Sequence, residues 1–303
     1  GHGGLRSAAR KQLMAGSAGR ALLTVGAAAL GAAAAYAAAR TLPERSRQPW
    51  ARTNHAGRPV TLLEGPAHAA GLATGAVLAG PPTMVAAVAA ASLGALDDLV
   101  GNTTSKGLQG HLRAAAQGQV TTGLLKIVGL GVTGAVTVAL ADRRARSTRW
   151  AGSAPDSAAD TAAYSTGVTS TLVGGAAVAG MANLLNLFDL RPGRALKVGM
   201  LVATPMVLRP TPGRIGAAAA VGASLGVLRP DLTGEAMLGD TGANALGAVL
   251  GLSLVERRPT RTRLALLTVV AALTLASEKV SFTKVIESTP VLREIDGWGR
   301  ASR

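Results

Sequence analysis

Long apolar runs separated by short polar segments dominate the chain. A helix needs roughly 20 mostly apolar residues to cross a bilayer, and several runs approach that length. The runs are Ala18–Arg40, Ala67–Leu96, Val120–Leu140, Ala159–Ala182, Leu196–Leu208, Gly216–Leu228, Ala243–Val255 and Leu264–Ala276. This pattern predicts an all-α fold, a polytopic integral membrane helix bundle.

The second run contains a strong break at Pro81 and Pro82, directly after Gly80. Two prolines next to a glycine disfavour a continuous helix. We therefore predict a tight hairpin of two short helices here, with a single kinked span as the alternative. The hairpin brings the total to about nine transmembrane helices, with a range of roughly eight to ten.

The hairpin has a consequence for topology. It places an even number of spans between each pair of consecutive polar segments in the loops. Asp97, Asp98, Asp189 and Asp240, which lie in or beside these segments, are then expected on the same membrane face. A single span at Pro81 would break this parity.

The composition agrees with a membrane protein. Apolar residues make up 48% of the 303 residues and charged residues 16%, whereas soluble domains carry about 25% charged residues. This excludes a water-soluble globule of this size, and the high apolar content excludes a disordered chain. The absence of cysteine excludes disulfide scaffolds and cysteine nucleophiles. We expect a single membrane domain over residues 1–303.

The chain is strongly basic, with 31 Lys and Arg against 16 Asp and Glu, a net charge of +15. The basic residues form short clusters between apolar runs, as in loops that flank membrane helices, so nucleic acid is not an expected partner. Their numbers on the two faces differ too little to set the orientation. We place the polar face in the cytoplasm, at a bacterial plasma membrane, because of the chemistry described next.

Asp97 and Asp98 end an apolar run. Paired carboxylates at a membrane boundary are costly unless they bind a cation or a basic group, and they oppose the dipole at a helix C-terminus. Metal binding or acid–base chemistry is therefore favoured over a solvated helix end. Downstream, Lys106, His111 and Arg113 can bind phosphate or be ordinary loop cations.

A second group places polar residues at every third position, Asn183, Asn186 and Asp189. On a helix they form one stripe. Their oxygens suit a hard cation or a sugar and phosphate network, and a hydrogen-bonding stripe inside the bundle is the alternative. Arg191 and Arg194 follow and are candidates for a pyrophosphate clamp.

In the third group Asp240 lies between Gly239 and Gly242, where the next apolar run begins. It is either a helix N-cap or part of a phosphate-binding helix start. Together with Asp97, Asp98 and Asp189 it would form a carboxylate cluster among basic residues. Such a cluster fits a Mg²⁺ ion that bridges a diphosphate.

These segments resemble the polyprenyl-phosphate N-acetylhexosamine-1-phosphate transferases, the superfamily that includes phospho-N-acetylmuramoyl-pentapeptide transferase. The resemblance extends over about residues 50–250. Its motifs are Asp97-Asp98, Asn183-x-x-Asn186-x-x-Asp189 and Gly239-Asp240-Thr241-Gly242, with Arg52 and His55 ahead of Gly57 and Pro59.

The resemblance implies a bundle of ten or eleven helices with a cytoplasmic site, a UDP-like nucleotide-sugar donor and a polyprenyl phosphate acceptor. It implies Mg²⁺ as cofactor, with Mn²⁺ as an alternative, held by Asp240 and Asp97. A homodimer is an open option. The residues expected to be catalytic are Asp97, Asp98, Asp189 and Asp240. Those expected to bind substrate are Asn183, Asn186, Lys106, His111, Arg113, Arg191, Arg194, Arg52 and His55.

The C-terminal part departs from that family. Its late histidine-rich loop is missing, since all four histidines lie at or before position 111. Residues 277–303 instead suggest an amphipathic tail that is cytoplasmic or interfacial. A non-catalytic relative that binds a lipid phosphate or a partner protein, as regulator or scaffold, is therefore a second hypothesis. A transporter is less favoured because the polar groups lie at span ends and no internal repeat is seen.

Overall fold

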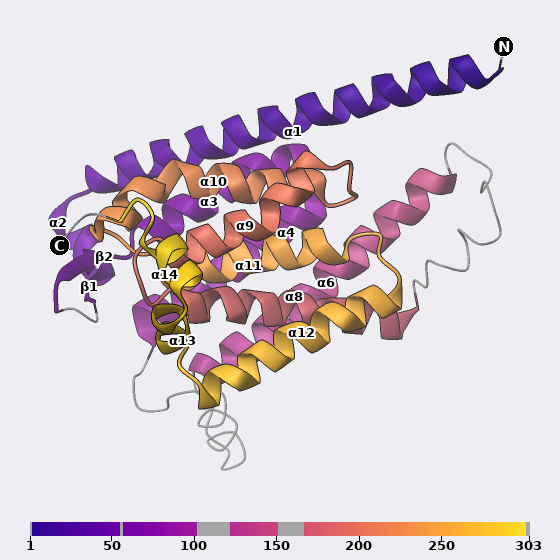
Figure 1. Cartoon of the computed structure of the whole chain (residues 1–303). Helices are drawn as coiled ribbons and strands as arrows, with labels where there is room; N and C mark the ends of the chain where they lie inside the picture. Colours follow the sequence, from indigo (N-terminus) through magenta and orange to yellow (C-terminus); the bar gives the residue numbers. More distant parts are fainter. Residues whose placement is uncertain (1, 55–56, 102–121, 151–166, 301–303) are drawn as a thin grey trace.

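A computed structural model describes residues 2–54, 57–101, 122–150 and 167–300. Nine helices run along a common direction in the described part of the chain (Figure 1). They are α1 (His2–Arg40), α3 (Glu64–Ala79), α4 (Pro81–Val100), α6 (Thr122–Trp150), α8 (Val168–Phe188), α9 (Arg194–Leu208), α10 (Arg214–Thr233), α11 (Gly239–Val255) and α12 (Thr260–Lys279). The smaller elements are α2 (Glu44–Arg47), η1 (Gln48–Trp50), β1 (Ala51–Thr53), β2 (Pro59–Thr61), α13 (Phe282–Ser288) and α14 (Pro290–Gly297).

The helices are those of a multi-pass membrane protein. Within the described ranges, six are long and apolar enough to cross a bilayer, namely α1, α4, α6, α8, α10 and α12. The other three, α3, α9 and α11, have 16, 15 and 17 residues and pack among them. Each predicted apolar run is thus helical where it is described, whereas the full count of nine spans stays a prediction.

The predicted hairpin at the two prolines is confirmed. Helix α3 ends at Ala79 and α4 begins at Pro81, so Gly80 alone joins them. Its φ of 114° lies in a region that glycine adopts without steric cost. Because the chain reverses here, Asp97 and Asp98 return to the end of the bundle at which α3 began.

Several helices extend beyond the apolar runs that predicted them, most of all α6, which continues past Leu140 to Trp150. The helix expected to end at Ala182 continues to Phe188, because its apolar face continues to pack through Leu184 and Leu185. Its described part starts at Val168, and residues 159–166 lie outside the described ranges. The last long helix extends to Lys279, so residues 277–279, expected in the tail, belong to α12.

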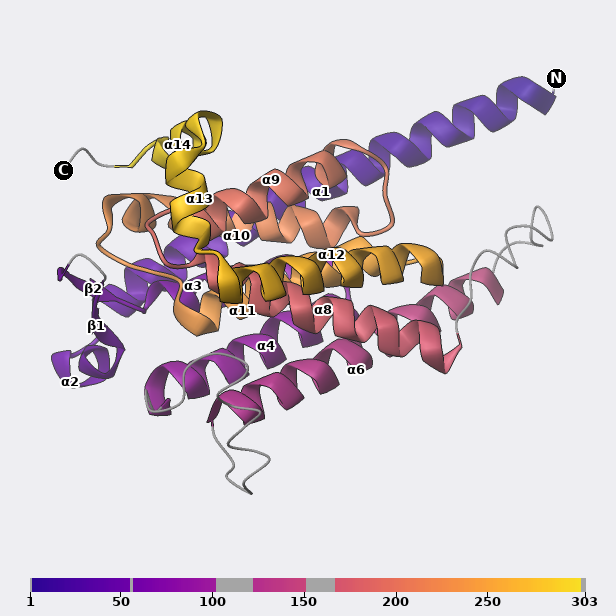
Figure 2. The same cartoon turned by 60° about the horizontal axis from the view of Figure 1, so that its bottom comes forward.

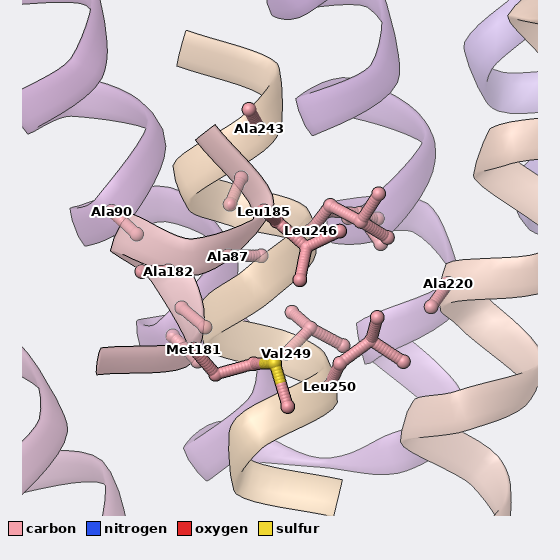
Figure 3. Packing of buried hydrophobic residues seen from close by; sticks show 14 of the residues in the cluster. Ala87, Ala90, Met181, Ala182, Leu185, Ala220, Ala243, Leu246, Val249 and Leu250 are labelled. Atoms are coloured by element: carbon pink, nitrogen blue, oxygen red, sulfur yellow. The ribbon is translucent and has the colours of Figure 1, made fainter. Parts of the chain in front are cut away.

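Helix α11 lies at the centre of the bundle, between α8 and α4 (Figure 3). Small residues allow these helices to approach closely. A Cβ added at Gly247 would lie 2.5 Å from the Cα of Ala182. The residues packed around this contact include Ala87, Ala90, Met181, Ala182, Leu185, Ala243, Leu246, Val249 and Leu250.

One end of the bundle carries the predicted motifs. Helices α4 and α8 end there and α11 begins there, and we call it the acidic end. Strands β1 and β2 form an antiparallel hairpin at this end. Thr61 ties the hairpin to the segment before α11, since its N–H donates to Glu235 O (3.2 Å) and its carbonyl accepts from Met237 N (3.0 Å).

Near the opposite end, a buried ion pair links α6 to α12. The guanidinium of Arg263 donates to both carboxylate oxygens of Asp142, at 2.6 and 2.9 Å, and both side chains are 1% exposed. Arg263 also donates to the carbonyl of Ser170 on α8 (3.2 Å). Three helices are therefore joined through one arginine.

Candidate active site at the acidic end

Asp98 caps the start of α11 from a different helix. One carboxylate oxygen accepts from the N–H of Asp240 (3.0 Å), and the other accepts from the N–H (2.8 Å) and the hydroxyl (2.6 Å) of Thr241. Carboxylates are stabilised at helix N-termini by these unpaired amides and by the helix dipole. Asp240, in the first turn of α11, does not cap the helix itself.

We expect Asp98→Ala to destabilise the protein by about 1–3 kcal/mol, because three donors at the start of α11 lose their acceptor. Asp98→Asn keeps one acceptor oxygen and should lose less. Thermal unfolding of the two variants in detergent measures the difference. Equal stability of the alanine and asparagine variants would contradict the capping role.

Asp189 holds the residue that precedes Asp240. It lies just past the end of α8, is 6% exposed, and accepts from the N–H of Gly239 (2.8 Å). Burial, and next the charge of Asp231, raise the pKa of the Asp189 carboxyl well above its ordinary value, and the Gly239 N–H offsets part of this effect. The contacts of Asp98 and Asp189 therefore bring two predicted motifs to the first turn of α11, which contains Asp240.

Gly239 itself permits this junction. Its φ is 58°, and an added Cβ would lie 2.9 Å from a carboxylate oxygen of Asp98. Any other residue would both strain the backbone and crowd the cap.

Lys126 joins the remaining two aspartates. Its ammonium group lies 3.5 Å from a carboxylate oxygen of Asp97 and forms an ion pair with Asp240. Lys126 comes from the start of α6, and sequence reasoning missed it as a site residue. The available signal was a single cation inside an apolar run, which is a mark of function in membrane helices.

All four predicted aspartates meet at one end of the bundle, as parity predicted.

Close packing of α4 on α11 sets the positions of these groups. A Cβ added at Gly94 would collide with the backbone carbonyl of Asp240 and would lie 2.6 Å from the Cα of Thr241. There is therefore no room for a side chain at position 94, one turn before Asp98, against the first turn of α11.

We expect Gly94→Ala to push these helices apart and to lower the free energy of unfolding by about 1–3 kcal/mol, as overpacking does. The matched control is Gly131→Ala on α6, where an added Cβ meets nothing within 4 Å. Thermal unfolding compares them, and equal stability of the two variants would exclude the close contact.

A cavity of about 500 Å³ opens beside Asp97 and Lys126, between α6, α8 and α12. Asn183 and Asn186 line the same cavity, so these two members of the predicted stripe share a face. Thr274 and Glu278 add polar groups from α12, and most of the other lining is apolar. It includes Ile127, Leu130, Leu187, Leu267, Val270 and Leu275. The cavity thus has a charged end and an apolar body.

Arg52 lies at the rim of this site. From the exposed strand β1 its guanidinium donates to the backbone carbonyl of Asp98. The other predicted ligands His55, Lys106, His111 and Arg113 lie outside the described residues, so their roles stay predictions.

Arg191 and Arg194 are engaged by the C-terminal tail. Arg194 is 3% exposed and donates to both carboxylate oxygens of Asp296, at 2.8 and 3.1 Å. Arg191 donates to Glu287 at 3.1 Å. A diphosphate could reach Arg194 only by displacing the tail, whereas the side chain of Arg191 is 29% exposed. A pyrophosphate clamp that uses both cations therefore requires movement of the tail.

The tail contact should depend on pH. Burial alone would raise the pKa of Asp296, but its hydrogen bonds and ion pairs with Arg194 and Arg300 hold it below the ordinary value of 3.8. A carboxyl group whose pKa is lower in the folded than in the unfolded state stabilises the folded state at any pH above its unfolded pKa. This stabilisation is lost as the pH falls through the lower, folded-state pKa.

We therefore expect the tail to stay docked near neutral pH and to loosen only below about pH 4. Amide-proton protection in α14, compared with that in α11 of the same sample, measures this. Loss of protection already near neutral pH would show that Asp296 does not hold the tail.

Two more acids lie deeper, and sequence reasoning did not select them. Glu64 at the start of α3 and Asp231 near the end of α10 are at most 1% exposed, and their carboxyl groups adjoin. Asp231 accepts from the N–H of Gly193 at 2.9 Å, which fixes the turn before Arg194.

The described residues include no group of three or more acidic or histidine side chains that could hold a metal alone. Asp97 and Glu278 do line the cavity together with Asn183 and Asn186, and Asp240 is joined to Asp97 through Lys126. Mg²⁺ usually keeps several waters and binds one or two carboxylates together with substrate phosphates. The donor set therefore fits an ion that arrives with a diphosphate.

Neither a protein-family model nor a curated protein matches the chain.

Proposed function

We propose that this protein is a membrane glycosyl-1-phosphate transferase, which moves a sugar-1-phosphate from a UDP-like nucleotide sugar to a polyprenyl phosphate. One observation carries the proposal. The charged group of Asp97, Lys126 and Asp240 lies at the end of an apolar cavity of about 500 Å³. A lipid with a phosphate head and a hydrocarbon chain is likewise charged at one end and apolar along the rest. Helix α12, which forms one wall of the cavity, is mostly uncovered, since Arg263 and Val270 are its buried residues.

In the reaction, an oxygen of the polyprenyl phosphate forms a bond to the sugar-linked phosphorus of the donor. The bond from that phosphorus to the bridging oxygen breaks, and the nucleoside monophosphate leaves with the electron pair. A phosphate monoester loses its second proton near pH 6, so little base strength is required. Asp97 would orient the acceptor phosphate, and Lys126 would offset negative charge on the phosphates.

The remaining residues have supporting roles. Asp97 and Asp240 would hold Mg²⁺, and bound Mg²⁺ supplies charge stabilisation to a diphosphate. Asp98 and Asp189 position the first turn of α11, which contains Asp240, through the hydrogen bonds described above. Asn183 and Asn186 would bind the nucleotide or the sugar. We place the acidic end at the cytoplasmic face of a bacterial plasma membrane, where nucleotide sugars for cell-envelope glycans are dissolved.

Transfer of label tests the proposal. The full chain in lipid nanodiscs is mixed with Mg²⁺, undecaprenyl phosphate and UDP-sugars that carry a radiolabelled sugar. We expect label in the lipid fraction together with an equal amount of UMP, and we expect both to disappear in Asp97→Asn. Binding of undecaprenyl phosphate without transfer from any UDP-sugar would instead support the non-catalytic relative. A chain that neither binds the lipid phosphate nor transfers sugar would overturn the proposal.

A further inference from the structure

The C-terminal tail presents apolar side chains that the described part of the chain leaves largely uncovered. Val291 and Ile295 lie one turn apart on α14, and Trp298 directly follows the last residue of the helix. Val291 and Trp298 are 64% and 65% exposed, and Ile295 is partly buried. Asp296, on another side of the helix, binds Arg194 and Arg300. The helix is therefore fixed to the bundle through its acid and leaves its apolar side open.

The tail lies at the level where the membrane helices end. Helix α12 exposes Leu264, Val269 and Leu275, as a lipid-facing helix does, and α13 begins three residues after Lys279. Arg194 and Lys197, which hold Asp296, belong to the first turns of α9. Figures 1 and 2 show α13 and α14 at the same end of the bundle as β1 and β2.

The surroundings of these apolar side chains are basic. Residues 191–197 and 279–300 together carry seven cations against three acids. Two of those acids, Glu287 and Asp296, are already paired with arginines of the bundle or the tail. The exposed remainder, which includes Lys284, is positive and complements an anionic surface.

We propose that α14 is an interfacial anchor that inserts Val291, Ile295 and Trp298 among the headgroups of an anionic phospholipid leaflet. Tryptophan is favoured at this depth because its ring is apolar and its N–H is polar. Binding strength follows from buried apolar area together with attraction to anionic lipids. The anchor also holds the tail against Arg194, but it does not depend on the proposed reaction.

Spin labelling of the full chain tests the anchor, and the absence of native cysteine makes each label unique. A label at Val291→Cys is compared with one at Arg293→Cys, about 160° away around the same helix, in nanodiscs with and without anionic lipid. We expect the Val291 label to be relaxed mainly by oxygen, which concentrates in lipid, and the Arg293 label mainly by a water-soluble nickel chelate. In Lys284→Gln the Val291 label should lose its dependence on anionic lipid.

Equal access of the nickel chelate to both labels, in both lipid compositions, would overturn the anchor. As a second measurement that leaves α14 unchanged, Trp50→Phe combined with Trp150→Phe leaves Trp298 as the sole tryptophan, which is excited selectively over tyrosine at long wavelength. Its emission should be quenched by lipids brominated near the headgroup more strongly than by lipids brominated near the chain end. Absence of quenching by both lipids would contradict insertion.

Discussion

Replacing Asp240 with asparagine is expected to lower the rate of sugar-phosphate transfer by about 10²–10³-fold, the cost of removing one preorganised electrostatic group. Asparagine keeps the shape of the side chain, and the cap of α11 uses the backbone N–H of residue 240 rather than its side chain. The fold should therefore survive, while Lys126 loses a charged partner and the site loses a ligand for Mg²⁺. Initial rates of lipid-linked sugar formation at saturating donor measure the effect.

The matched control is Glu44→Gln, which removes a carboxylate from an exposed side chain in α2. It should transfer sugar at the wild-type rate, and both variants should unfold near the wild-type temperature. An Asp240→Asn rate within about twofold of wild type would refute the role of this carboxylate.

Breaking the buried pair at the opposite end should have the largest effect on stability. In Arg263→Met the carboxylate of Asp142 stays 1% exposed without its bidentate partner. Removing one member of a buried ion pair costs about 3–5 kcal/mol, because the other charge remains buried without compensation. The free energy of unfolding in mixed micelles, measured as denaturing detergent is added, should fall by that amount.

Two variants separate this explanation from a general effect of substitution in α12. Arg261→Met changes an exposed arginine in the same helical turn and should have little effect. The double variant Arg263→Met, Asp142→Leu replaces both charges and should recover most of the loss. A double variant as unstable as Arg263→Met alone would show that the uncompensated charge is not the cause.

The apolar pattern was sufficient to predict the long helices, and Gly80 with the two prolines that follow it predicted the hairpin. Each span is an apolar run whose backbone hydrogen bonds are local, so the pattern needs no partner to be interpreted. Parity then predicted that Asp97, Asp189 and Asp240 would meet. The end of α8 was misplaced because Asn183 and Asn186 are polar residues on the cavity side of a helix whose other side is buried.

Contacts between distant segments could not be predicted in the same way. Arg194 is bound by Asp296, about a hundred residues further along the chain, and the residue pattern near Arg194 does not indicate this partner. Lys126 and Asp231 likewise have roles that depend on which helices are neighbours. The sequence also did not predict that the carboxylate oxygens of Asp98 cap α11, whereas Asp97 lines the cavity.

Binding of Mn²⁺, observed by electron paramagnetic resonance, tests most directly whether the acidic end holds a divalent ion on a diphosphate. The chain in nanodiscs is titrated with Mn²⁺ in the presence and absence of a UDP-sugar. We predict a bound ion that requires the nucleotide sugar and is lost in Asp240→Asn and in Asp97→Asn, but retained in Glu44→Gln. Bound Mn²⁺ that persists in both aspartate variants, or wild-type protein that binds none in the presence of the UDP-sugar, would contradict the magnesium–diphosphate site.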